Sequence, residues 1–121
     1  MSETAVYHDL HTAKFIDRVT DLQRDIHELA IEKGWWDEPR NDGELIALMH
    51  SELSECLEAL RHGNPQDDKL PEFTSAEVEL ADVVIRVLDM AEARGWRVAE
   101  AIVAKHEFNR SREWKHSGKK F

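Results

Sequence analysis

Two pairs of acidic residues share one spacing in this chain. Glu52 and Glu55 stand three positions apart in the stretch SELSE, and Glu79 and Asp82 repeat the spacing in ELAD. Positions three apart lie on the same side of an α-helix. Each pair would therefore present two carboxylates to one side, provided that both segments are helical.

The first pair lies next to apolar positions. Residues 44–61 have helical periodicity, and the pair falls just beside their expected apolar stripe, which consists of Ile46, Met49, Leu53, Cys56 and Leu60. Burying ionised carboxylates is costly without a counter-charge, so such a placement would indicate a function. Acidic pairs at this spacing are also common on solvated helices, and the first pair alone favours that interpretation.

The second pair is more informative because its segment, residues 75–94, is apolar around most of its circumference. Such a helix is expected to be buried nearly all round. Its single polar strip contains Glu79, Asp82, Arg86 and Asp89. Two interpretations follow: a four-carboxylate cluster holding one or more hard cations, Mg²⁺ or Mn²⁺, or a network of salt bridges centred on Arg86.

A third set of polar residues favours the metal site. One face of residues 98–112 begins with Val98 and Ile102 and continues with Lys105, Asn109 and Arg112. Cations beside a metal–carboxylate cluster are suited to binding polyphosphate. The alternative is a basic helix end favoured by the helix dipole, which explains Arg112 well and Lys105 poorly.

Four helices must position these side chains. The periodicity predicts helices over about 12–33, 44–61, 75–94 and 98–112, and Thr74 with Glu77 forms a capping box before the third. No alternation typical of strands is sustained. We predict an all-α fold, a bundle of four main helices in one domain over residues 1–121, ending in an irregular basic tail at about 113–121.

The composition restricts the function further. The net charge is −9, and residues 1–104 carry 10 basic against 23 acidic residues, which argues against a general nucleic-acid binder. No apolar run approaches the length of a membrane span, and no signal peptide is evident. The single cysteine, Cys56, is expected to be a buried apolar group in a reducing compartment. We expect a cytoplasmic protein that gains stability by subunit association.

The motifs resemble those of a known family. SELSE, then ELAD 23 residues after Glu55, and the closing segment KHEFNRSREWKHSGKKF are similar to the signature of the MazG-like all-α nucleoside-triphosphate pyrophosphohydrolases. The resemblance extends from about residue 27 to the C-terminus. Two positions differ from the common pattern: Ser51 stands where many relatives have glutamate, and Glu113 stands where proline is usual.

The resemblance implies Mg²⁺-dependent hydrolysis of a (deoxy)nucleoside triphosphate to the monophosphate and pyrophosphate, by dimers or tetramers. Glu52 and Glu55 would be candidates for the catalytic base. The implied metal ligands are Glu52, Glu55, Glu79 and Asp82. The implied phosphate ligands are Lys105, Asn109 and Arg112.

The resemblance also implies a base pocket. His27 and Trp36 have the spacing of the histidine and tryptophan that help to enclose the base in relatives preferring pyrimidine deoxynucleotides. An enzyme of the dCTP or dUTP type and one that removes aberrant nucleotides are equally open. Trp35 could instead be the ring that contacts the base, and both tryptophans could simply pack in a core or an interface.

Two other kinds of metal site fit the sequence less well. A ferritin-like di-iron site needs Glu-x-x-His on two helices, and here it occurs only once, at Glu113 and His116. The scattered histidines contain no zinc motif. The remaining alternative is a non-catalytic helical interaction module that keeps the family fold.

Overall fold

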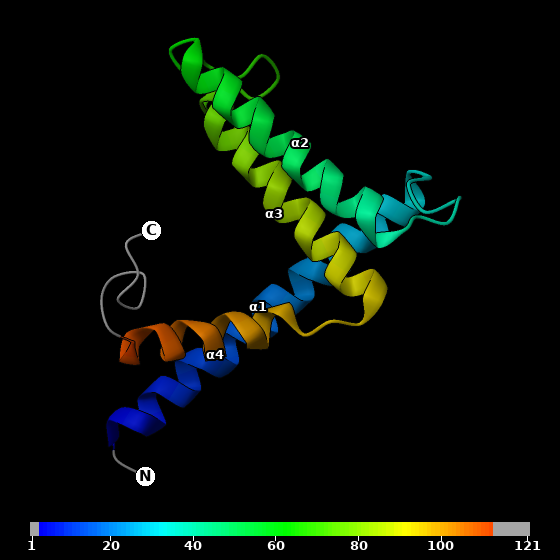
Figure 1. The fold of residues 1–121 in the computed structure, drawn as a ribbon. Helices are drawn as coiled ribbons and strands as arrows, with labels where there is room; N and C mark the ends of the chain where they lie inside the picture. Colours follow the sequence, from blue (N-terminus) through cyan, green and yellow to red (C-terminus); the bar gives the residue numbers. More distant parts are fainter. Residues whose placement is uncertain (1–2, 113–121) are drawn as a thin grey trace. The chain divides into compact units, whose positions relative to one another are not determined.

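The computed structural model describes the backbone of residues 3–112 and the side chains of residues 11–112. Four α-helices account for most of this part of the chain (Figure 1). They are α1 (Glu3–Glu32), α2 (Asp42–Arg61), α3 (Ser75–Arg94) and α4 (Val98–Ser111). The only strand-like feature in the described region is an isolated bridge between Gln66 and Thr74. The all-α prediction is confirmed.

The helix boundaries follow the capping signals in the sequence. Asn41 caps α2, and Thr74 caps α3 in the predicted capping box with Glu77. Gly95 ends α3 in the left-handed conformation, at φ 69°. The first helix begins at Glu3 rather than near residue 12, because its first turns contain neither glycine nor proline to stop it. The predicted basic tail at 113–121 lies outside the described residues.

The chain divides into two units. Residues 22–96 form one, which contains the end of α1 together with α2 and α3, and the segments on either side form the other. In the first unit α2 and α3 run side by side in opposite directions, joined by the loop 62–74 (Figure 1).

The packing of α2 on α3 places an acid in the interface. The buried residues of α2 are Leu45, Glu52 and Cys56. Cys56 is buried as predicted, and its thiol lies 3.8 Å from the carbonyl oxygen of Ala76. The predicted apolar stripe was wrong by about one position, because Ile46, Leu53 and Leu60 are exposed while Glu52 takes a buried place.

The surface of α3 also differs from the prediction. The helix was expected to be buried nearly all round, but Leu80, Val84 and Ile85 are 49, 54 and 45% exposed in the single chain. Buried residues gather instead towards its C-terminal half, at Leu88, Asp89, Met90 and Ala91. Among residues 3–112, no helix combines the length and the apolar character that crossing a bilayer requires.

Candidate metal and nucleotide site

Three of the four predicted metal ligands come together between α2 and α3. Carboxylate oxygens of Glu52, Glu55 and Glu79 all lie within 4.8 Å of one another. The α2 pair, Glu52 and Glu55, lies close to Glu79 of α3 because the two helices pack side by side. Glu52 is buried and Glu55 is exposed, so the cluster reaches from the helix interface to solvent.

The fourth predicted ligand, Asp82, is not a member of this close group, but it is an electrostatic neighbour. Burial raises the pKa of Asp82, and the negative charge of Glu52 raises it further. Asp82 and Glu52 also line the same cavity. It therefore stands at the edge of the cluster.

The cluster carries more negative charge than its surroundings compensate. Burial, followed by hydrogen bonding to Glu52 and Glu55 and by their charges, raises the pKa of Glu79 to about 7. The Oε2 atom of Glu79 is buried and has no hydrogen-bond partner within the described part of the chain. A buried acceptor without a partner is costly, and a bound cation would relieve that cost.

The salt bridge considered in the sequence analysis is present as well. The Nε atom of Arg86 donates a hydrogen bond to Oε1 of Glu52 over 3.0 Å. Burial would raise the pKa of Glu52, but the hydrogen bonds from Arg86, Glu79 and Glu55 outweigh it and lower that pKa. Within the described residues, Arg86 therefore pairs with one member of the carboxylate cluster, and metal binding by the cluster stays a prediction.

The donor set fits a hard divalent cation. All three clustered side chains offer carboxylate oxygen, and Asp82 offers another close by. Mg²⁺ and Mn²⁺ prefer such oxygen ligands, whereas zinc sites usually include histidine or thiolate. These residues could therefore hold Mg²⁺ or Mn²⁺.

His27 and Trp36, predicted as a pair, meet at a residue that the sequence analysis did not assign to the site. The Nδ1 atom of His27 lies 2.7 Å from Oδ1 of Asp89, and the indole nitrogen of Trp36 donates to Oδ1 and Oδ2 of Asp89 over 3.0 and 3.2 Å. The two rings meet edge to face, with 5.4 Å between centroids. The available signal was the polar strip of α3, to which Asp89 belongs.

The loop that carries the tryptophans is fixed at both ends. Gly34 follows the end of α1 with φ 88°, a backbone conformation that residues other than glycine rarely adopt, and turns the chain towards Trp35. Arg40 donates to the carbonyl oxygen of Trp35 over 2.7 Å, and Arg94 of α3 donates to the carbonyl oxygen of Arg40 over 2.7 Å. The tryptophans are thereby held against α3.

A cavity of about 440 Å³ lies beside the carboxylate cluster. Its apolar wall consists of Ile26, Leu29, Ala30 and Ile85. Trp35 lines the cavity, whereas Trp36 is not among the lining residues, and the polar lining includes Glu52, Asp82, Arg86 and Asp89. The ring of Trp35 also carries the guanidinium of Arg40 at 3.6 Å from its centroid. The cavity has the size and the mixed lining of a small-ligand pocket.

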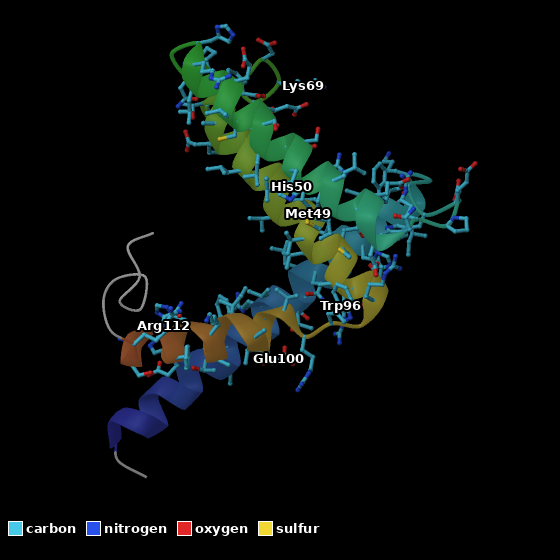
Figure 2. The ribbon with its side chains drawn as sticks, in the orientation of Figure 1. Met49, His50, Lys69, Trp96, Glu100 and Arg112 are labelled. Atoms are coloured by element: carbon cyan, nitrogen blue, oxygen red, sulfur yellow. The ribbon has the colours of Figure 1, made fainter. Side chains whose placement is uncertain are left out.

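The three predicted phosphate ligands lie near one another at the end of α4. Lys105 and Asn109 line a shallow cavity on this helix. Arg112 follows at the C-terminal end of α4 (Figure 2), where its Nη1 atom is 3.4 Å from Oδ1 of Asn109. Lys105 and Arg112 both approach the ring of Phe108, at 4.8 and 5.7 Å from its centroid. Their role as phosphate ligands stays a prediction.

Comparison with known proteins supplies one informative relative. The dATP/dGTP diphosphohydrolase of Cyanophage S-2L is 34% identical over 93 residues, which cover 74% of this chain and 77% of the relative. The chain belongs to the family of this diphosphohydrolase. No family model matches the sequence, and no solved structure matches it either. Membership of the MazG-like group therefore stays a prediction.

Proposed function

We propose that the present protein hydrolyses a deoxynucleoside or nucleoside triphosphate to the monophosphate and pyrophosphate in a Mg²⁺-dependent reaction. The observation that carries the proposal is the cluster of Glu52, Glu55 and Glu79, with carboxylate oxygens within 4.8 Å of one another, beside a cavity of about 440 Å³. The membership of a nucleotide diphosphohydrolase family supports it.

The proposed reaction is attack of water on the α-phosphorus. A bond forms between the water oxygen and the α-phosphorus, the bond from that phosphorus to the bridging oxygen breaks, and its electron pair leaves with pyrophosphate. Mg²⁺ held by Glu52, Glu55, Glu79 and Asp82 would supply a Lewis acid that lowers the pKa of water and stabilises charge on the phosphates.

The water must also lose a proton, and Glu52 and Glu55 are the proposed acceptors. Glu55 is the exposed member of the cluster, so a proton taken there can pass on to solvent. Glu52 is buried and hydrogen-bonded to Arg86, which suits a carboxylate that stays ionised. On these grounds Glu55 is the better acceptor of the two.

Lys105, Asn109 and Arg112 are proposed to bind the phosphates. Two cations and an amide on one face of a helix end can hold several phosphate oxygens at once. His27 and Trp36 are proposed to contribute to base binding through Asp89, whose carboxylate both contact. The name of the phage relative favours dATP and dGTP for this chain, whereas His27 and Trp36 have the spacing found in relatives that prefer pyrimidine deoxynucleotides.

The exposed apolar residues of α3 support association into a homodimer or homotetramer. Leu80 and Val84 are each about half exposed on a helix that is apolar around most of its circumference. Burying such a face against a second copy would remove it from water. A cytoplasmic location also stays a prediction.

The test is hydrolysis of the common nucleoside and deoxynucleoside triphosphates with Mg²⁺, scoring monophosphate and pyrophosphate separately. Wild-type protein is compared with Glu79→Gln and with Glu58→Gln, a matched control on the exposed side of α2. We expect both products from wild type and from the control, and at least about a hundredfold less from Glu79→Gln, because the variant loses a ligand charge.

The alternative, an interaction module without catalysis, predicts a different pattern. Such a module would release no pyrophosphate from any nucleotide, and its fold would be indifferent to Mg²⁺. The proposal is contradicted if Glu79→Gln hydrolyses nucleotides as fast as wild type. It is also contradicted if Mg²⁺ binds equally well to the Glu52→Gln, Glu79→Gln double variant.

A further inference from the structure

Asp89 is a buried carboxylate with acceptor capacity to spare. It is 7% exposed, and it lines the cavity beside Trp35. Its Oδ1 atom receives the contacts from His27 and Trp36, whereas Oδ2 receives only the longer contact of 3.2 Å from Trp36. A carboxylate offers about four lone-pair positions, so part of this capacity remains available, chiefly at Oδ2.

The carboxylate is held in one orientation. His27 approaches it from α1 and Trp36 from the following loop, and Asp89 itself is on α3. Three chain segments therefore fix the acceptor before any ligand arrives. A pre-oriented buried acceptor discriminates between ligands because a partner without a donor leaves it uncompensated.

The rest of the cavity suits a flat aromatic ligand. Ile26 and Ile85 supply apolar surface, and Trp35, whose ring has Arg40 at 3.6 Å and Arg86 at 5.1 Å from its centroid, adds aromatic surface to the same lining. The other carboxylates in the lining, Glu52 and Asp82, belong to the cluster or its edge, and Arg86 is engaged by Glu52. Asp89 is thus the acceptor in this lining that is left for reading a base edge.

We propose that Asp89 is a specificity-determining residue that accepts hydrogen bonds from the amino-bearing edge of a nucleobase in this cavity. The inference rests on the proposed function and narrows its substrate class to nucleotides of adenine, guanine and cytosine. Adenine and cytosine each offer an amino group, and guanine offers its amino group and the adjacent ring N–H together.

Uracil and thymine are disfavoured by the same chemistry. Each has one ring N–H on its pairing edge, between two carbonyl oxygens, and those oxygens would face the negative carboxylate. A hydrogen bond to a charged group corresponds to about a 10- to 100-fold difference in binding. The two substrates that name the phage relative, dATP and dGTP, both carry an amino group, in agreement with this preference.

The experiment measures binding rather than turnover, so that it stands apart from the test of catalysis. The α,β-imido analogues of dCTP and dUTP are titrated calorimetrically into the full chain with Mg²⁺, and those of dGTP and dITP form a second pair that differs in one amino group. We expect wild type to bind the amino-bearing member of each pair about 10- to 100-fold more tightly.

The informative variant is Asp89→Asn. Its amide oxygen can still accept from Trp36, but its NH₂ group donates and the negative charge is lost, so each ratio should fall to within about threefold. The matched control is Glu92→Gln, one turn further along α3, where the side chain contacts Gln23 rather than the cavity. This control should keep the wild-type ratios.

The outcomes separate the inference from the proposed function. Wild-type ratios near one, a preference for dUTP, an equal loss for every analogue in Asp89→Asn, or no binding of any analogue would overturn the role of Asp89. Hydrolysis by the same protein sample is measured independently. The proposed catalysis can therefore be confirmed while the base preference is refuted, or the base preference confirmed while catalysis is refuted. If Asp89→Asn does not fold, the ratios that wild type shows for the two pairs of analogues still test the predicted preference for an amino group.

Discussion

Two kinds of acidic side chain reach the same cavity, which is lined by Glu52 of the carboxylate cluster and by Asp89. Glu52, Glu55 and Glu79 crowd their charges together, and Arg86 compensates only part of them. Asp89 is instead surrounded by donors, from His27 and Trp36. Crowded acids suit a cation, and a donor-held acid suits a neutral ligand with N–H groups.

The two adjacent tryptophans should differ in their effect on nucleotide binding. Trp35→Ala should weaken binding of an α,β-imido nucleotide about 10- to 100-fold, because its ring lines the cavity and stacking contributes at this level. Trp36→Phe should keep most of the binding, because it removes only the donor to Asp89. Isothermal titration measures both. Equal losses, or the larger loss at Trp36, would contradict this assignment.

The raised pKa of Glu79 predicts how the stability of the metal-free protein depends on pH. The folded-state pKa is about 7, against an ordinary value of 4.5. Between these two pH values Glu79 is protonated in the folded protein and ionised in the unfolded chain. The stabilisation from this group is complete below about pH 4.5 and is lost as the pH rises through 7. Asp82, whose pKa is also raised, acts in the same direction.

Urea unfolding in EDTA at several pH values measures this dependence. The denaturation midpoint of wild type should fall between pH 5 and 8, and that of Glu79→Gln should fall much less, since the amide does not titrate. The lowered pKa of Glu52 acts with the opposite sign, but below its ordinary value of 4.5 and therefore outside this window. A midpoint that rises with pH in wild type would refute the assignment.

At the scale of the helices, the sequence predicted most boundaries but not the buried faces of α2 and α3. The capping box at Thr74 and the helix end at Gly95 depend on local sequence, and the structure confirms both. The face of α2 was misplaced because Glu52 is buried against α3 with Arg86 as its partner, a pairing between residues 34 positions apart. Periodicity within one helix carries no information on such a partner.

The same distinction explains what could be foreseen of the site. The spacing of the acids predicted a cluster of four carboxylates, and the structure brings Glu52, Glu55 and Glu79 together with Asp82 at the edge. The role of Asp89 depends on where the end of α1 and the loop after it meet α3. That is a tertiary contact, and the sequence offered only the polar strip as a hint.

At the scale of the whole molecule, the exposed apolar side chains are unfavourable for a single chain in water. Sixteen large hydrophobic side chains within the described region are exposed, from all four helices and the loops between them. A single chain that leaves so much apolar surface in water is expected to associate. Association is therefore a physical expectation from this surface as well as from the resemblance.

Sedimentation analysis of the wild type should show a dimer or tetramer. A double variant, Leu80→Glu with Val84→Glu, should dissociate it by placing charges on the apolar face of α3. Leu70→Glu, in the loop between α2 and α3, adds a similar charge at an exposed leucine outside that helix and should leave the assembly intact. A monomeric wild type at micromolar concentration would contradict the expectation.

The central claim is attack at the α-phosphorus, and ³¹P NMR of products formed in H₂¹⁸O tests it most directly. The substrate is a deoxynucleoside triphosphate that the enzyme hydrolyses, with Mg²⁺. We predict that ¹⁸O enters the monophosphate and that the pyrophosphate is unlabelled. Label in the pyrophosphate, or release of inorganic phosphate and a diphosphate instead, would contradict the proposed reaction.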